Sequence, residues 1–108
     1  MKEDIKKCLV DLGNLFRDLG IDNKYDSSLK TCSIGEYEKI NSIIINQKLH
    51  NPWFTNKNIR KSLLSLSCLC KENELNKFID SYSIDFKKKP LNVGIIMAGN
   101  IPLVGFHD

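Results

Sequence analysis

Residues 92–97 read Asn-Val-Gly-Ile-Ile-Met, and this short run decides whether the chain is purely helical or α/β. Its apolar residues stand on successive positions rather than alternating, which is typical of a strand covered on both faces. Lys89-Pro90 precedes the run and Ala98-Gly99-Asn100 follows it, so both ends carry turn residues. The run therefore predicts the first buried strand of a parallel α/β sheet, and it separates a segment over residues 1–90 from a second domain that begins at residue 91.

The rest of that sheet is not visible in the sequence. A buried strand needs neighbouring strands for its backbone hydrogen bonds, and no second strand pattern occurs in the 108 residues. Ile101-Pro102-Leu103 after the strand is typical of the first turn of a helix, with proline near its start. We therefore expect the partner strands to lie in a carboxy-terminal continuation, which makes residues 91–108 the start of a truncated α/β domain.

Upstream of Pro90, apolar residues at three- and four-residue steps predict about four helices. The first should end at Gly20, because glycine accepts the left-handed conformation that follows a helix. The second should open with a capping box over Ser33-Ile34-Gly35-Glu36 and end near His50. Thr55 can cap the third, and a fourth, short helix follows Asn73. The expected apolar faces are Ile5, Cys8, Leu9, Leu12, Leu15, Phe16 and Leu19, then Tyr37, Ile40, Ile43 and Ile44, then Ile59, Leu63, Leu64, Leu66, Cys68 and Cys70, and finally Leu75, Phe78, Ile79 and Tyr82.

Two aromatic residues, Trp53 and Phe54, stand in the turn between the second and third helices. Large aromatic side chains gain most when they are buried, so we expect both to anchor the turn in a groove between helices. The alternative is a surface that contacts a partner or a substrate.

Charge and hydropathy exclude several classes of protein. Sixteen basic residues are interleaved with 13 acidic ones, and the net charge is only +3. This distribution does not produce the strong positive electrostatic field that is typical of proteins that bind nucleic acid. The dense basic run Lys87-Lys88-Lys89 has no aromatic ladder and is typical of a solvated turn. No apolar run is long enough to span a membrane, and the charged start at Met1-Lys2-Glu3-Asp4 lacks the apolar stretch of a secretory signal. These features favour the cytoplasm.

The four cysteines are Cys8, Cys32, Cys68 and Cys70. We expect all four to be free thiols that pack as small, buried hydrophobic residues. The alternative is that some of them are metal ligands or nucleophiles. Cys68 and Cys70 are two apart on a predicted helix, so their side chains point in different directions and cannot easily share one metal ion. No metal site is predicted.

Ala98-Gly99-Asn100 occupies the place where ligands gather in α/β sheets, beyond the carboxyl end of a strand. The carboxamide of Asn100 donates hydrogen bonds without carrying charge, which suits stabilisation of a developing oxyanion. Its alternative role is to cap the following helix or to brace its own loop. Neither a G-x-G-x-x-G fingerprint nor a P-loop is present around these residues.

The stretch from Val93 to Asp108 resembles the segment that opens the cofactor-binding, Rossmann-like domain of fatty acyl-CoA reductases of the bioluminescence type, within the aldehyde dehydrogenase superfamily. The resemblance implies that a cysteine attacks an acyl-CoA thioester and that NADPH or NADH then releases the aldehyde. It implies that Asn100 binds the oxyanion and that Met97, Ala98 and Gly99 line the nicotinamide side of the cofactor cleft.

The sequence departs from that family in two ways. Ala98-Gly99 stands where the wider superfamily often has Pro-Trp, and none of the four cysteines lies beyond Asn100, where the family's nucleophile belongs. We therefore expect the chain to be an amino-terminal part that is inactive by itself. The alternative, of a different class, is a non-catalytic helical interaction module.

Overall fold

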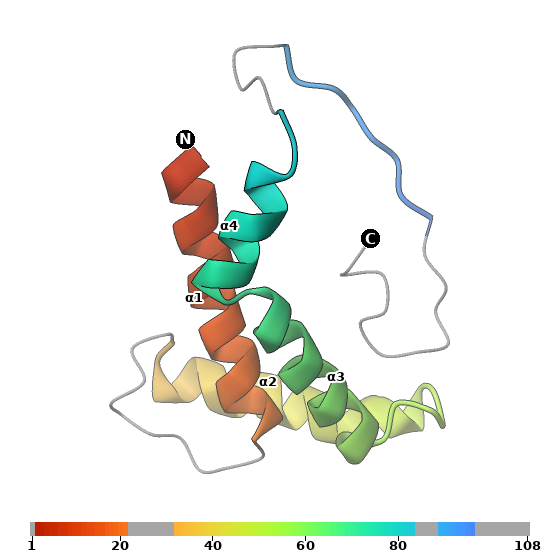
Figure 1. The fold of residues 1–108 in the computed structure, drawn as a ribbon. Coiled ribbons are helices and arrows are strands. Elements are labelled where there is room, and N and C mark those ends of the chain that lie inside the picture. The colour runs from red at the N-terminus through yellow and green to blue at the C-terminus, as the bar shows by residue number, and fades with distance from the viewer. Residues whose placement is uncertain (1, 22–31, 84–88, 97–108) are drawn as a thin grey trace.

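The computed structural model describes residues 2–21, 32–83 and 89–96, and over these residues the chain is mostly helical (Figure 1). The predicted set of about four helices is confirmed. In chain order the elements are α1 (Lys2–Gly20), α2 (Ile34–Asn46), the short 3-10 helix η1 (Gln47–Leu49), α3 (Asn56–Leu69) and α4 (Glu72–Asp80).

Local hydrogen bonds start two of these helices at the predicted positions. Before α2, the Ser33 amide donates to the Glu36 carboxylate at 2.8 Å, and the Glu36 amide donates to the Ser33 hydroxyl at 3.3 Å, which completes the capping box. The hydrogen bond from the Ser33 backbone, followed by that from its hydroxyl, lowers the pKa of Glu36. At α3, the Thr55 hydroxyl accepts from the Asn58 amide at 3.2 Å.

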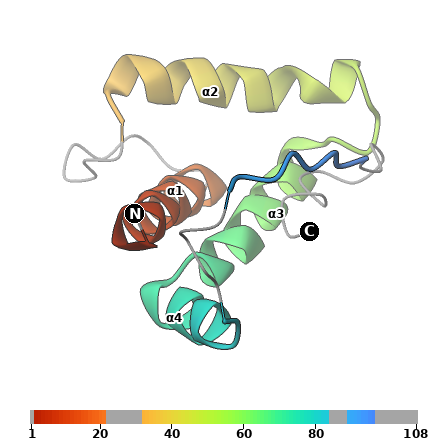
Figure 2. The ribbon, with the colours of Figure 1, turned by 90° about the horizontal axis from the view of Figure 1, so that it is seen from above.

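The four helices pack around the α1–α3 contact. Figure 2 shows α2 lying across both of these helices, and Figure 1 shows α4 beside the first half of α1. Two ion pairs join α4 to α1: the Lys2 ammonium lies 3.3 Å from the Asp80 carboxylate, and the Lys6 ammonium lies 3.9 Å from the Glu72 carboxylate. Both pairs are largely exposed on the acidic side, so each adds little to stability.

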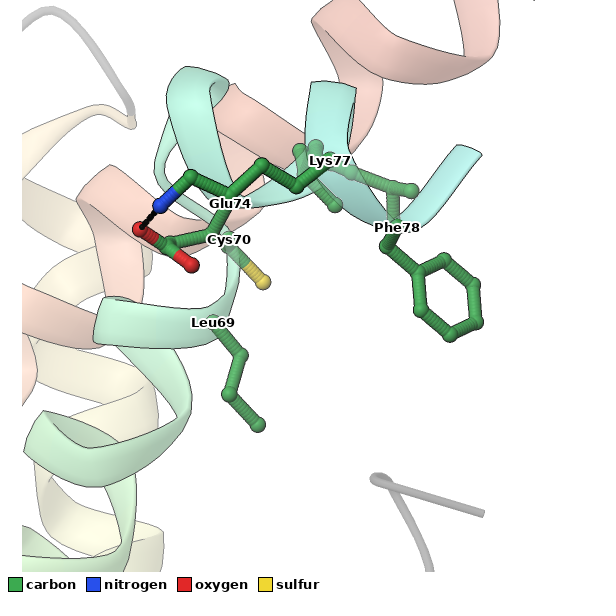
Figure 3. Close-up of a pocket in the computed structure, with 7 residues that line it drawn as sticks. Leu69, Cys70, Glu74, Lys77 and Phe78 are labelled. Carbon is green, nitrogen blue, oxygen red and sulfur yellow. Dashed lines mark hydrogen bonds and ion pairs between the residues drawn. The ribbon is translucent and has the colours of Figure 1, made fainter. Parts of the chain in front are cut away.

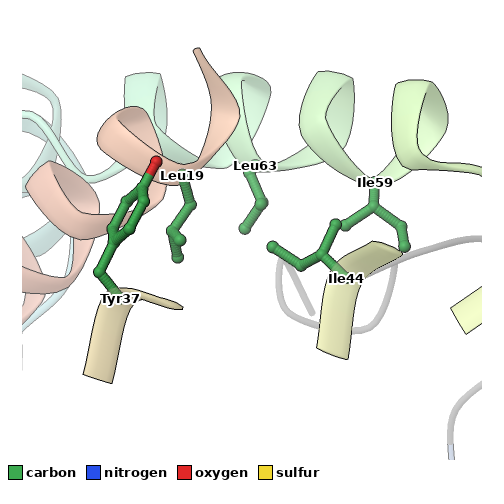
Figure 4. Close-up of a cluster of buried hydrophobic side chains, with 5 residues drawn as sticks. All are labelled: Leu19, Tyr37, Ile44, Ile59 and Leu63. Atoms are coloured by element: carbon green, nitrogen blue, oxygen red, sulfur yellow. The ribbon is translucent and has the colours of Figure 1, made fainter. Parts of the chain in front are cut away.

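Side chains from α1, α2 and α3 meet in one hydrophobic cluster (Figure 4). Each of these helices contributes through residues of its predicted apolar face. The buried members are Leu19, Tyr37, Ile44, Ile59 and Leu63, and Leu15, Phe16, Cys32, Ile40 and Phe54 pack against them while partly exposed. Burial of about five such side chains supplies the main driving force for this three-helix arrangement.

A buried arginine holds the same three helices together by polar contacts. Arg60 of α3 is 4% exposed, and its guanidinium donates to the Leu19 carbonyl of α1 and to the Asn41 side chain of α2. Its Nε also donates to the Asn56 side chain at 2.8 Å. Burial of a charge is costly unless it is hydrogen-bonded, and these contacts meet that requirement.

Two glycines of α1 allow close packing against α3. A Cβ atom on Gly13 would overlap the Cβ of Cys70, and one on Gly20 would lie 2.7 Å from Cγ of Leu64. Gly20 ends α1 as predicted, but its backbone is not in the left-handed region. The expected reason was therefore wrong, and what requires glycine at this position is the lack of space.

Several residues of the predicted apolar faces are not buried. The helices are single layers around a small core, so positions at the edge of each stripe face solvent. The exposed members of the predicted faces are Ile5, Cys8, Ile43, Leu64, Cys68, Phe78 and Tyr82. The predicted burial was wrong at these positions.

The two aromatic residues of the turn before α3 differ in burial. Phe54 packs against the core cluster as expected, whereas Trp53 is 70% exposed and does not anchor the turn. The turn is held instead by backbone and amide groups, because the Trp53 amide donates to the Asn51 side chain at 3.0 Å and the Asn58 side chain donates to the Trp53 carbonyl at 2.9 Å.

Residues 92–96, the described part of the predicted strand, form no strand, and together with residue 91 they run clear of the helices (Figure 1). Their apolar side chains face solvent, with Leu91 88% and Ile96 103% exposed. Residue 97 lies outside the described residues, as do residues 84–88, which contain Lys87 and Lys88 of the predicted basic turn. None of the helices in the described part of the chain combines the length and apolar character that crossing a bilayer requires.

Candidate functional site

The residues predicted from the sequence to carry chemistry all lie in one stretch outside the part of the chain that the structure describes. Asn100, predicted as the oxyanion donor, and Met97, Ala98 and Gly99, predicted to line the cofactor cleft, fall within residues 97–108, outside the described residues. The site has therefore to be sought among the helices.

A groove of about 430 Å³ lies where the end of α3 and the start of α4 meet α1. Four of its lining residues are apolar, and the others are a cysteine and an oppositely charged pair. The lining residues are Leu9, Leu69, Cys70, Glu74, Leu75, Lys77 and Phe78. Its volume falls within the range of about 300–1,000 Å³ that is usual for ligand sites.

The turn between α3 and α4 creates this groove. Helix α3 ends at Leu69 and α4 begins at Glu72, so side chains from the two helices face one opening. Figure 3 shows Leu69, Cys70 and Phe78 projecting toward the same side. Leu75 is buried in the floor, whereas Leu69 is 45% and Phe78 63% exposed. The groove thus presents uncovered apolar surface.

The groove offers little reactive chemistry. Burial raises the pKa of the Cys70 thiol, so this sulfur stays protonated and is a poor nucleophile at neutral pH. At the edge, the Lys77 ammonium lies 2.9 Å from the Glu74 carboxylate (Figure 3), and the two charges neutralise each other. This arrangement favours an uncharged apolar group over an ionic ligand.

A second, smaller cleft of about 180 Å³ lies beside α1 and shares Cys70 with the groove. It is lined by residues of mixed character: Val10, Gly13, Asn14, Arg17, Ser67, Cys70, Lys71 and Glu72. The Arg17 guanidinium is 3.5 Å from the buried Asp18 carboxylate, and Glu72 also lines the cleft. Because both signs of charge are present, the cleft does not select an anion or a cation.

None of the four cysteines, all of which lie in the described part of the chain, forms a disulfide in the structure. Their environments differ, however: Cys70 is buried and Cys32 partly buried, whereas Cys8 and Cys68 are exposed. Among the described residues no group of three or more metal-ligating side chains comes together.

Sequence reasoning missed the groove, although one signal pointed to it. Leu75, Phe78 and Ile79 form a wide apolar stripe on α4, which has only nine residues, and Tyr82 continues the pattern just past its end. Leu75 alone among the residues of α4 is buried, because this short helix touches its neighbours over a small area. An apolar stripe that exceeds the available contact surface indicates a face still to be covered.

Comparisons of the chain with protein-family models, with curated proteins and with solved structures gave no match.

Proposed function

We propose that this chain is the amino-terminal helical part of an acyl-CoA reductase, which reduces a fatty acyl-CoA thioester to an aldehyde with NADPH or NADH. The resemblance of residues 93–108 to that family supports the proposal. The observation that carries it is the state of residues 91–96, whose apolar side chains are exposed without any covering layer. Such a segment is expected where a strand of a Rossmann-like sheet has its neighbouring strands elsewhere in the parent protein.

In the proposed reaction a cysteine of the parent would attack the thioester carbonyl, so that negative charge develops on the carbonyl oxygen. The bond from the acyl carbon to the CoA sulfur would then break, and CoA would leave as its thiol while the acyl group stays on the cysteine. The Asn100 side chain would donate a hydrogen bond to that oxygen, while Met97, Ala98 and Gly99 would line the cofactor cleft. NADPH or NADH, when bound, would supply a hydride to the acyl carbon, and loss of the cysteine thiolate would release the aldehyde. The cysteine of this step is not one of the four in this chain, because all of them precede Asn100.

The described helices fit a supporting role in that enzyme. The thiol at their main groove has a raised pKa, and the groove has a neutral, ion-paired edge. These are properties of a packing surface rather than of a catalytic centre. We therefore expect the 108-residue chain alone to form no aldehyde.

The experiment is to express the gene region with the coding sequence that follows Asp108 and to follow aldehyde release from acyl-CoA with NADPH and with NADH. Asn100→Ala should lower kcat about a hundredfold and leave KM nearly unchanged, because the lost interaction forms mainly in the transition state. Its melting temperature should stay near that of the wild type. Normal turnover with a lowered melting temperature would show instead that Asn100 caps a helix.

A second candidate function is a self-standing helical interaction module, and the groove between α1, α3 and α4 favours it. This module would bind a partner through the apolar surface of Leu69 and Phe78 and would need no residue beyond the helices. Aldehyde formation by the 108-residue chain alone would contradict both candidates. An open reading frame beyond Asp108 that yields an active reductase would exclude the module.

A further inference from the structure

Two apolar surfaces of the described chain are uncovered. One is the concave groove between α1, α3 and α4. The other is the drawn-out stretch of residues 91–96 (Figure 1), here called the tail segment. The side chains of Phe78 in the groove and of Ile95 in the tail segment are both more than half exposed, so the two surfaces do not cover each other within one chain.

The tail segment can present a row of apolar side chains. In an extended chain, alternate residues point to one side about 6.6 Å apart, which places Leu91, Val93 and Ile95 in one row. The segment Leu-Asn-Val-Gly-Ile-Ile carries no charge. Gly94 has open space around it, so the backbone is free to approach another surface closely.

The groove matches this row in polarity. Its lining is mainly apolar, and the ion pair between Lys77 and Glu74 leaves no net charge at its edge. A charged peptide would find no net opposite charge to attract it in the groove. An uncharged apolar segment, by contrast, would cover Leu69 and Phe78 without burying an unpaired charge.

We propose that the tail segment of one copy of this chain binds in the groove of a second copy, and that the exchange is reciprocal. Each copy offers one groove and one tail segment, so a twofold arrangement covers both pairs of surfaces at once. Each contact is small, but the second forms within an already associated pair and is therefore strengthened by its high effective concentration. This dimer concerns the 108-residue chain and does not depend on the proposed reductase function, in which neighbouring strands of the parent's sheet would cover the same residues instead.

The test is sedimentation of the 108-residue chain between about 5 and 200 µM, a range that detects weak self-association. We expect a monomer–dimer equilibrium. Phe78→Ser in the groove and Ile95→Ser in the tail segment should each raise the dimer dissociation constant about tenfold or more. Leu49→Ser removes an exposed leucine from η1, outside the groove and the tail segment, and should leave the dissociation constant unchanged.

Mixing the two variants identifies the contact. A mixture of Phe78→Ser and Ile95→Ser chains retains one intact groove and one intact tail segment in each mixed pair, so it should associate where either variant alone remains monomeric. Far-ultraviolet circular dichroism checks that the helices persist, and Ile95 lies outside the helices, so its variant stays informative if Phe78→Ser fails to fold. A monomeric wild type at the highest concentration overturns the proposal. So does a Phe78→Ser chain that dimerises as the wild type does, since the tail segments would then pair with each other.

Discussion

At the scale of single residues, Arg60 is the side chain on which the packing of three helices depends. Its guanidinium reaches the Leu19 carbonyl and the Asn41 side chain from inside the structure. Arg60→Ala leaves both acceptors without this donor, and each buried unsatisfied group costs about 1–3 kcal/mol. We expect the free energy of unfolding to fall by about 2–4 kcal/mol, measured by urea titration with circular dichroism.

The neighbouring residue provides the control for that experiment. Lys61 is exposed on the same helix, so Lys61→Ala should change the free energy of unfolding by less than about 0.5 kcal/mol. Arg60→Lys keeps the positive charge but loses the planar guanidinium group with its several donors. Its free energy of unfolding should therefore lie between those of Arg60→Ala and Lys61→Ala. Equal stability of Arg60→Ala and Lys61→Ala would show that the hydrogen bonds of Arg60 do not stabilise the packing of the three helices.

Also at this scale, the cysteines should differ in reactivity. Burial raises the pKa of the Cys70 thiol, so the thiol stays protonated at any pH below this raised pKa. Because the thiolate is the reactive form, alkylation of Cys70 speeds up only when the pH rises to the pKa of its thiol. At pH 8 we expect Cys70 to be alkylated by iodoacetamide at least about tenfold more slowly than the exposed Cys8 and Cys68, as followed by mass spectrometry. Unfolding in urea should make the three rates similar, and similar rates in the native chain would show that Cys70 is accessible.

At the scale of elements, the crossing of α1 and α3 depends on Gly13. A methyl group at this position would meet the Cβ of Cys70, so the helices would have to move apart. Replacing glycine with alanine inside a helix stabilises the helix by about 0.8–1 kcal/mol. Overpacking typically costs about 1–3 kcal/mol, so the destabilising effect should be the larger of the two. We expect Gly13→Ala to lower the melting temperature.

Gly35 in the first turn of α2 is the matched control. A Cβ atom there meets nothing within 4 Å, so Gly35→Ala should raise the melting temperature through helix propensity and a less flexible unfolded chain. Opposite signs for the two substitutions would confirm that close packing, and not helix propensity, determines the effect at residue 13. A stabilised Gly13→Ala chain would mean that α1 and α3 are farther apart.

At the scale of the whole molecule, the helices and the tail segment should differ in stability. The tail segment has no hydrogen-bonded secondary structure, whereas α3 contributes Ile59, Leu63 and Leu66 to the buried set. At about 5 µM we expect tail amides to exchange with solvent at least about a hundredfold faster than α3 amides, as measured by hydrogen exchange. At the higher concentrations where the proposed dimer forms, exchange in the tail segment should slow. Protection of the tail equal to that of α3 at low concentration would show a partner within one chain.

What the sequence determined by itself is the position of the helices. The Ser33–Glu36 capping box and the Thr55 cap are signals carried by residues near one another in the chain, so no knowledge of the fold was needed. The apolar stripes also identified most of the core, because a helix can bury only one face.

Only the tertiary structure decided which members of each stripe are covered. Ile43 and Phe78 have the spacing of core residues but remain exposed, because burial requires another element at the right place and angle. The same cause places Arg60 inside and Trp53 outside, against their usual preferences. The groove between α1, α3 and α4 likewise exists because three separately encoded helices meet around Cys70, and that meeting is a long-range contact that no local pattern in the sequence records.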